Sequence, residues 1–156
     1  MYRKLFTISL VFALLQGCAS VPTESHTASQ QAKRFPEPPY GSAYLYVYRS
    51  TPFGQALEKD LWLNDECIGA TANNIFFVTE IIGEGATHKL STESEFSPNH
   101  LMFKAESGES YFVEQYIKLG VFVGGADLRI IEADKAKSII RKLKLGKPGI
   151  CSRQNL

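Results

Sequence analysis

Short apolar segments separated by turn residues run through most of this chain, and they limit its fold more than any other feature. In residues 43–49 three tyrosines alternate with alanine, leucine and valine, so a strand here would present two different faces. Glycine, proline, asparagine and aspartate recur between such segments, as turns require. Short strands with regular turns predict a sandwich or a barrel. We expect strands at residues 43–49, 60–63, 67–71, 75–82, 86–92, 101–105, 111–119 and 128–131.

The C-terminal part of the body has a different period. Apolar residues recur there at helical spacing, with acidic residues before them and basic residues after them. Gly146 and Pro148 are expected to end this helix. The apolar set is Ala136, Ile139, Ile140 and Leu143. We therefore expect a mainly β fold, with one antiparallel β-sandwich-like domain over residues 41–145 and one C-terminal amphipathic helix that covers a sheet face or edge.

Charge is distributed unevenly along the chain. Residues 41–134 carry six Lys or Arg against fourteen Asp or Glu, whereas residues 135–156 carry seven basic residues and no acidic one. A basic helix on an acidic body explains this pattern, because the basic residues interleave with apolar core positions. A basic face for anionic lipid or a cell-wall polymer is the alternative.

The first 18 residues have the order of an export signal. Arg3 and Lys4 precede an apolar run over residues 5–15, which is too short for a membrane-spanning helix of roughly 20 residues. The Leu-Gln-Gly-Cys sequence that follows and ends at Cys18 resembles a bacterial lipobox. The resemblance implies a lipoprotein signal peptide at residues 1–17, cleavage before Cys18, and attachment of diacylglycerol and palmitate to that cysteine. An ordinary secretory signal with a chance cysteine is the alternative.

The residue that follows the lipid-bearing cysteine sorts lipoproteins in Gram-negative cells. Here it is Ala19 rather than an aspartate, so the resemblance implies the outer membrane and its periplasmic face. Each buried methylene of the acyl chains adds about 0.8 kcal/mol to the anchoring. Residues 18–40 are rich in Ser, Thr, Gln and Pro and predict a flexible tether. Residues 146–156 are expected to form a tail.

Two further cysteines, Cys67 and Cys151, remain in the mature chain. The periplasm is oxidising, so a disulfide between them is allowed. In the chain-entropy model, closing so long a loop contributes on the order of 4–5 kcal/mol. The alternative is a small buried Cys67 and a free Cys151 in a loose tail.

Aromatic side chains are the candidate ligand contacts. Tyr44, Tyr46 and Tyr48 share one face of the first strand, and Trp62 is a large anchor on the second. These side chains would form a stacking platform for sugar if they were exposed. A half-buried core stripe with hydroxyls that reach outward is the interpretation we favour.

Sequence motifs for common catalytic chemistry are absent. The chain has no Gly-x-Ser-x-Gly elbow and no phosphate-binding loop, and Gly120, Gly124 and Gly125 do not match a dinucleotide fingerprint. The three histidines and the acidic pair are weak candidates for metal binding or acid–base work, and Cys67 with His88 for a thiol dyad. His88 is expected to point inward and His100 outward. The candidates are His26, His88, His100, Glu93 and Glu95. We predict no catalytic site, no metal, no cofactor and no nucleic-acid partner.

Four segments of the body stand out by their motifs. They are Ala-Tyr-Leu-Tyr-Val-Tyr-Arg at 43–49, Leu-Trp-Leu-Asn-Asp-Glu-Cys-Ile-Gly at 61–69, Gly-Ala-Thr-His-Lys-Leu at 85–90 and Gly-Glu-Ser-Tyr-Phe-Val at 108–113. Together they resemble a family of small bacterial lipoproteins, domain of unknown function 2846. The middle part also resembles the hairpins of small PEGA-type β domains. The resemblance implies a β-rich fold in the cell envelope, and it supplies no catalytic residues.

These observations lead to one functional expectation with two alternatives. We expect an outer-membrane-anchored periplasmic lipoprotein with a non-catalytic binding or scaffolding role. Its expected partners are the membrane, through the lipid anchor, and an envelope protein or cell-wall polymer. The alternatives are a carbohydrate- or peptidoglycan-binding module and an enzyme with an unrecognised site.

Overall fold

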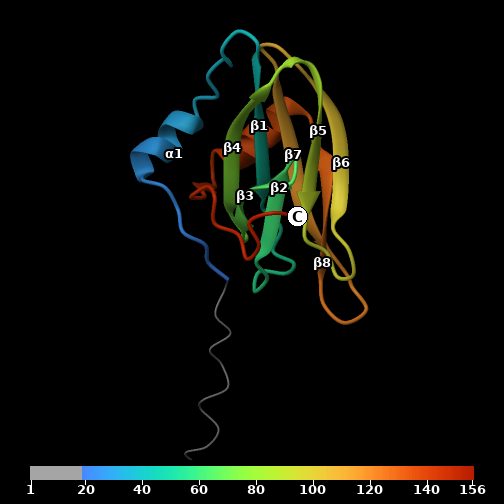
Figure 1. Ribbon diagram of the computed structural model, residues 1–156. Coiled ribbons are helices and arrows are strands. Elements are labelled where there is room, and N and C mark those ends of the chain that lie inside the picture. Colours follow the sequence, from blue (N-terminus) through green and yellow to red (C-terminus); the bar gives the residue numbers. More distant parts are fainter. Residues whose placement is uncertain (1–18) are drawn as a thin grey trace, which may run out of the picture.

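Two β-sheets pack face to face in the computed structural model, which describes residues 19–156, and two short helices lie on the outer side of the larger sheet (Figure 1). The predicted signal peptide at residues 1–17 and the predicted lipid-attachment residue, Cys18, lie outside the described residues. The elements are α1 (His26–Ala32), β1 (Ser42–Arg49), β2 (Lys59–Leu63), β3 (Glu66–Thr71), β4 (Ile75–Ile82), β5 (Glu84–Thr92), β6 (Asn99–Glu106), β7 (Ser110–Lys118), β8 (Gly125–Ile130), α2 (Ala133–Ile140) and β9 (Lys144–Leu145). The mainly β, sandwich-like fold predicted from the sequence is therefore confirmed.

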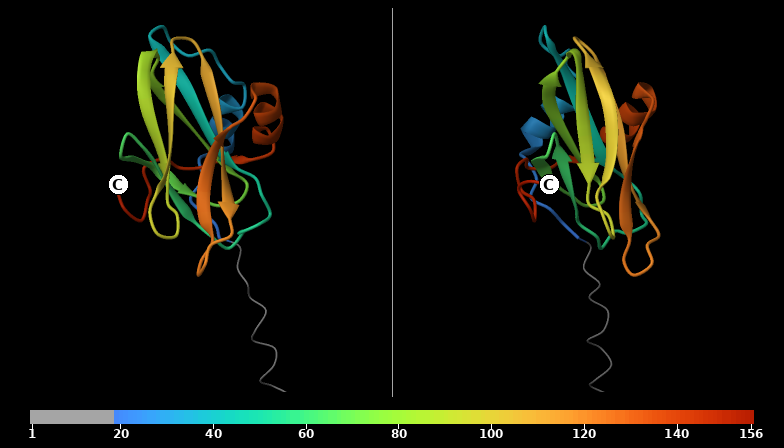
Figure 2. Two further views of the ribbon diagram at one scale, coloured as in Figure 1. Left: turned by 90° about the vertical axis from the view of Figure 1, so that its right-hand side faces the viewer. Right: turned by 45° about the vertical axis from the view of Figure 1, so that its right-hand side comes forward.

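The larger sheet has the strand order β8-β7-β1-β4-β9, and the smaller sheet has the order β3-β2-β5-β6. Most neighbours are antiparallel, but β1 is parallel to β7, with Tyr44 opposite Ser110 and Tyr48 opposite Glu114. β9 is also parallel to its neighbour β4. The first parallel pair arises because the chain leaves the larger sheet after β4, forms β5 and β6 in the smaller sheet, and returns as β7 (Figure 2). The larger sheet is thus mixed, whereas the sequence pattern predicted antiparallel strands.

Apolar side chains from both sheets fill the space between them. Ala43, Leu45 and Val47 of β1 are fully buried there, which confirms the predicted inward phase of this strand. Polar contacts of one buried amide also cross the core. Gln115 Nε2 of β7 donates to Thr92 Oγ1 of β5 at 2.7 Å, and the Thr71 hydroxyl of β3 donates to Gln115 Oε1. These bonds compensate for the burial of the amide and tie the two sheets together. The core residues of the smaller sheet include Leu61, Ile68, Leu90, Phe103 and Ala105.

The outer face of the larger sheet is covered by α2 and forms a second apolar cluster. Glu132 starts this helix, because its carboxylate accepts the N–H groups of Asp134 and Lys135 at 2.9 and 3.1 Å. The helix covers a sheet face as predicted, but it ends at Ile140 rather than near Gly146. The following residues form β9 beside β4 instead of another helical turn. The buried members of this cluster are Tyr46, Tyr48, Phe76, Phe112, Ala136, Ile140 and Leu143.

The described part of the predicted tether, residues 19–40, is folded onto the sandwich and includes α1. The Glu24 N–H donates to the Leu145 carbonyl at 2.9 Å, so the segment pairs with the edge strand β9. The Phe35 ring then packs on the outer cluster, with its centroid 5.4 Å from that of Tyr46. The prediction of a flexible tether is wrong for this segment. It has almost no large aliphatic residues, but its backbone pairs with β9 and the Phe35 ring anchors it to the outer cluster. Neither helix of the described chain has the length and apolarity that crossing a bilayer needs.

The C-terminal residues 146–156 lie along β3 rather than forming a loose tail. The Ala70 N–H donates to the Ile150 carbonyl at 2.7 Å, and the Gly149 N–H donates to the Ile68 carbonyl at 2.8 Å. These bonds use backbone groups of β3 that the sheet leaves unpaired at its edge. The segment therefore protects an edge strand, which the sequence pattern of this stretch did not indicate.

Candidate functional site

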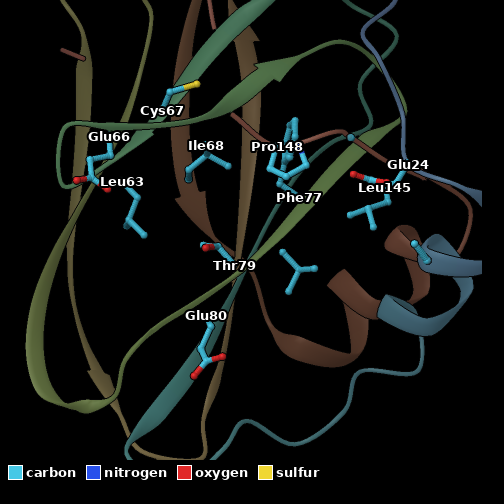
Figure 3. A pocket seen from close by; sticks show the side chains of 13 residues that line it. Glu24, Leu63, Glu66, Cys67, Ile68, Phe77, Thr79, Glu80, Leu145 and Pro148 are labelled. Carbon is cyan, nitrogen blue, oxygen red and sulfur yellow. The ribbon is translucent and has the colours of Figure 1, made fainter. Parts of the chain in front are cut away.

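A pocket of about 510 Å³ opens at one edge of the sandwich, between β3 of the smaller sheet and β4 and β9 of the larger sheet (Figure 3). Its size is within the range of small-ligand sites. α1 and the start of the C-terminal segment complete its walls. Most of the lining is apolar, and the polar part consists mainly of carboxylates at the rim. The apolar lining includes Leu63, Ile68, Phe77, Val78, Leu145 and Pro148.

The ring of Phe77 forms part of the pocket floor and is held between two glycines. A Cβ atom at Gly69 would lie 2.7 Å from the Phe77 ring, and one at Gly146 would lie 2.5 Å from it. Both distances are too short for ordinary contacts, so only glycine leaves room for the ring at these two positions. Phe77 itself is only 2 % exposed. The floor is therefore a fixed surface rather than a flexible one.

Three carboxylates, those of Glu24, Glu66 and Glu80, line the pocket. They come from the segment before α1, from β3 and from β4. The Glu80 carboxylate accepts a hydrogen bond from the Ser42 hydroxyl at 2.5 Å. Within residues 19–156 none of the three forms an ion pair. The pocket thus combines an apolar floor with uncompensated negative charge, which suits an apolar group that carries a cation.

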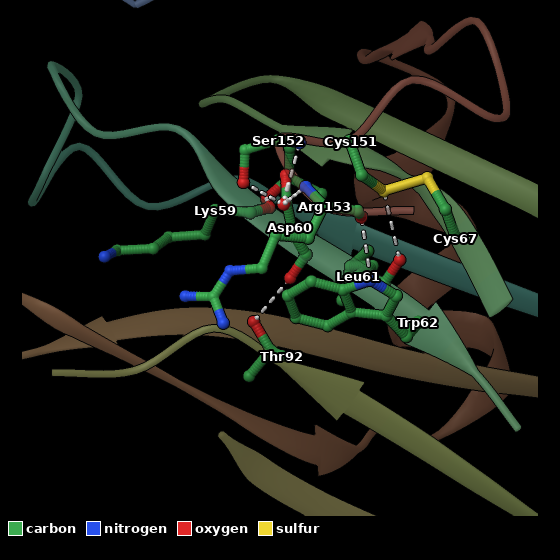
Figure 4. The surroundings of a disulfide bond; sticks show 10 residues. Lys59, Asp60, Leu61, Trp62, Cys67, Thr92, Cys151, Ser152 and Arg153 are labelled. Atoms are coloured by element: carbon green, nitrogen blue, oxygen red, sulfur yellow. Dashed lines mark hydrogen bonds between the residues drawn. A yellow bond between two sulfur atoms is a disulfide. The ribbon is translucent and has the colours of Figure 1, made fainter. Parts of the chain in front are cut away.

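A disulfide between Cys67 and Cys151 fixes the C-terminal segment beside the pocket (Figure 4). This is the pairing that the sequence left open. Asp60 of β2, only 3 % exposed, strengthens the attachment. Its carboxylate accepts the N–H of Ser152 at 2.9 Å, the hydroxyl of the same serine, and the N–H of Arg153 at 3.3 Å. The segment is therefore held by a covalent bond and by a buried carboxylate.

The predicted sugar-stacking aromatics do not form an exposed platform. Tyr46 and Tyr48 are fully buried beneath the helices, and only Tyr44 keeps part of its surface in solvent. Burial raises the pKa of both Tyr46 and Tyr48 to about 12. Trp62 is 2 % exposed, and its Nε1–H donates to the Arg153 carbonyl at 3.1 Å. Tyr46, Tyr48 and Trp62 therefore offer no exposed stacking surface, because α2 and the two terminal segments cover them. Their core placement agrees with the favoured interpretation, but the hydroxyls of Tyr46 and Tyr48 are buried and do not reach outward as expected.

The histidines lie apart and have structural partners. His88 is 4 % exposed and points inward as predicted, with Nε2 2.8 Å from the Ile82 carbonyl and Nδ1 3.1 Å from the Asn64 amide nitrogen. This pattern fits the neutral ring with its proton on Nε2. His100 points outward as predicted, and His26 lies on α1. Among the described residues no group of His, Cys, Asp or Glu is arranged to hold a metal ion.

Cys67 of the candidate thiol dyad and Glu95 of the acidic pair have structural roles. Cys67 is in a disulfide, so it provides no thiolate beside His88. Glu95 accepts backbone N–H groups of the loop between β7 and β8, including that of Val121 at 2.7 Å. Sequence reasoning missed the pocket carboxylates, because Glu24 lies in the predicted tether and nothing in the local pattern connects it with Glu66 or Glu80.

Comparison with known proteins identifies relatives of this chain. A family model described as "Protein of unknown function (DUF2846)" matches residues 39–126. A protein from Haemophilus influenzae (strain ATCC 51907 / DSM 11121 / KW20 / Rd), described as an uncharacterized protein, is 46% identical over 135 residues. The alignment covers 86% of this chain and 79% of that relative. The matched family region runs from just before β1 to the start of β8 and thus includes most of the sandwich.

Proposed function

This chain belongs to the DUF2846 family of proteins of unknown function, and on that premise we propose that it is a lipid-anchored, non-catalytic binding protein of the bacterial outer membrane. The lipobox-like sequence that ends at Cys18 supports the anchor, and Ala19 supports the outer membrane with the domain in the periplasm. The disulfide between Cys67 and Cys151 fits an oxidising compartment.

The pocket between β3 and β4 is the observation that carries the binding role. Its floor is apolar and fixed by Phe77, while Glu24, Glu66 and Glu80 supply negative charge at its rim. This combination favours a basic segment of an envelope protein, whose aliphatic side chains cover the floor while lysine or arginine meets the carboxylates. A basic ligand would also complement the net negative charge of residues 41–134.

A titration with a defined peptide tests the binding role. The full-length lipoprotein in non-ionic detergent is titrated with a short leucine–lysine peptide and with the matching leucine–glutamate peptide. The double variant Glu66→Gln and Glu80→Gln should bind the lysine peptide roughly 2- to 30-fold more weakly, because two exposed ion pairs contribute about 0.4–2 kcal/mol. Raising the salt concentration should weaken binding by the wild type more than binding by the variant.

Glu109→Gln is the matched control, because Glu109 is exposed and lies in the turn before β7, away from the pocket lining. It should bind the lysine peptide like the wild type. Equal affinities for the double variant and the wild type would contradict the pocket as the binding site. Equally tight binding of the leucine–glutamate peptide would contradict the charge preference.

A further inference from the structure

Exposed apolar side chains gather at one end of the sandwich. Soluble domains rarely expose large contiguous apolar patches, and such patches mark interaction sites. We call this set the apolar tip. The two phenylalanine rings that form its centre, Phe96 and Phe122, lie with their centroids 6.5 Å apart. The members and their exposed fractions are Phe53 (50%), Phe96 (76%), Leu119 (83%), Val121 (75%), Phe122 (83%) and Val123 (54%).

The apolar tip belongs to three loops that share the same end of the fold. β1 and β7 are parallel, so Arg49 and Lys118, their last residues, lie at the same end. The loops at residues 50–58 and 119–124 follow these two strands, and the loop at residues 93–98 joins β5 to β6. All three loops lie at the lower end of the molecule in Figure 1, and Figure 2 shows the same arrangement from two further sides.

Internal hydrogen bonds hold the tip loops in shape. Glu95 accepts the N–H groups of Val121 at 2.7 Å, of Phe122, and of Val123 at 3.1 Å. The carboxylate thus satisfies the backbone of the loop, and the apolar side chains point to solvent. The buried Arg49 does the same for the neighbouring loop, donating to the carbonyl of Leu57 at 2.7 Å and to that of Gly54. The tip is therefore an ordered apolar surface, pre-organised for contact.

The described chain also starts at this end. The Ala19 N–H donates to the carbonyl of Gln55, in the first tip loop, at 3.1 Å. Cys18 directly precedes Ala19 in the sequence, and consecutive Cα atoms are only about 3.8 Å apart. A lipid attached to Cys18 would therefore bring the apolar tip to the membrane surface.

We propose that the apolar tip inserts into the membrane interface beside the lipid anchor and so fixes the orientation of the sandwich on the bilayer. The inference rests on the proposed lipid attachment at Cys18. The surroundings favour apolar rather than electrostatic contact, because Lys118 is paired with Asp127 at 3.0 Å and Lys59 is 8 % exposed. Glu58 and Glu93 near the tip give anionic lipids no advantage, so zwitterionic lipid is sufficient.

Fluorescence quenching in vesicles tests this orientation. The full-length lipidated protein with Phe122→Trp is placed in phosphatidylcholine vesicles, with and without bromine on the acyl chains. Bromine quenches only a tryptophan that reaches the acyl region. We expect the emission of the new tryptophan to fall by at least about half in brominated vesicles and to be insensitive to salt. Trp62 is 2 % exposed, and the wild-type protein measures its background.

Tyr40→Trp is the matched control, because Tyr40 is 97% exposed and precedes β1 at the opposite end of the sandwich. Its emission should not change in brominated vesicles. Absence of quenching for Phe122→Trp, or equal quenching of both variants, would overturn the proposed orientation. Palmitate labelling and co-sedimentation with vesicles test the anchor separately. A labelled, vesicle-bound protein without quenching would refute the tip insertion alone, and an unlabelled protein would refute the proposed anchor.

Discussion

At the scale of single residues, the most unusual feature of the described chain is a set of buried side-chain polar atoms without hydrogen-bond partners. The hydroxyls of Tyr46 and Tyr48 are buried, and within residues 19–156 neither has a hydrogen-bond partner. Leaving such a group unsatisfied costs about 1–3 kcal/mol. The rings nevertheless contribute, because the Tyr46 ring stacks on that of Phe112 with centroids 5.0 Å apart. We infer that the aromatic bodies of these tyrosines, rather than their hydroxyls, stabilise the domain.

Tyr46→Phe should therefore leave the free energy of unfolding unchanged or raise it by up to about 3 kcal/mol, since it removes only the unsatisfied hydroxyl. Tyr46→Ala should lower it by about 3–5 kcal/mol through the loss of the ring. Urea denaturation of both variants checks this difference. A clear loss of stability in Tyr46→Phe would show that the hydroxyl has a stabilising partner.

Glu95 makes the order of the tip loop depend on pH. Desolvation raises the pKa of this carboxyl, but the N–H groups of Phe122, Val121 and Val123 outweigh it and hold the pKa below its ordinary value of 4.5. The ionised form is therefore favoured in the folded loop. Its contribution is complete above the unfolded pKa and is lost as the pH falls through the lower folded value.

Amide hydrogen exchange measures this dependence. The amides of Val121, Phe122 and Val123 should be protected at neutral pH and lose protection as the pH falls through the lowered pKa of Glu95. Glu95→Gln should reduce their protection at neutral pH, while Glu93→Gln should not, because no loop amide donates to Glu93. Unaltered protection in Glu95→Gln would show that the carboxylate does not order the loop.

At the scale of elements, α2 stabilises the domain through its apolar side. Ile140 is fully buried in the outer cluster, and Ile140→Ala should lower the free energy of unfolding by roughly 2–5 kcal/mol. Lys142 is exposed, and Lys142→Gln should change it by at most about 1 kcal/mol. Thermal melts compare the two. An unchanged melting temperature for Ile140→Ala would mean that the helix does not pack on the sheet in solution.

The disulfide should stabilise the fold by restricting the unfolded chain. Cys67 and Cys151 are 84 residues apart, and closing such a loop contributes about 2–5 kcal/mol. The double variant Cys67→Ser and Cys151→Ser should therefore unfold at lower denaturant concentration than the oxidised wild type. Reduced wild type should match the variant. Equal stability of all three forms would show that the bridge does not contribute.

Local patterns predicted some elements and missed others for identifiable reasons. Strict alternation over residues 43–49 identified β1 and its inward side, because the two-residue period of a single strand is enough to separate its two faces. The helical spacing around Ile140 identified α2, but its end depends on the long-range pairing of β9 with β4. α1 has only seven residues and no apolar stripe of its own. The parallel pairing of β1 with β7 and the pocket carboxylates depend on contacts between distant segments, which no local pattern contains.

At the scale of the whole molecule, the apolar tip and the pocket lie on different parts of the sandwich. One end carries the apolar tip and the first described residue, Ala19, whereas the pocket opens on the flank between β3 and β4. A domain anchored at Cys18 would turn the tip to the membrane and leave the pocket accessible from the periplasm. The disulfide and Asp60 keep the C-terminal segment against β3, so the pocket wall and the protected edge strand depend on the same contacts.

Lipid attachment is the premise on which the proposed location and the proposed orientation of the domain depend. Metabolic labelling with a palmitate analogue, followed by separation of the inner and outer membranes, tests it most directly. The wild-type protein should carry the label and collect in the outer-membrane fraction, while Cys18→Ser should be unlabelled and leave that fraction. Equal labelling of both proteins, or a wild type without label, would contradict the account.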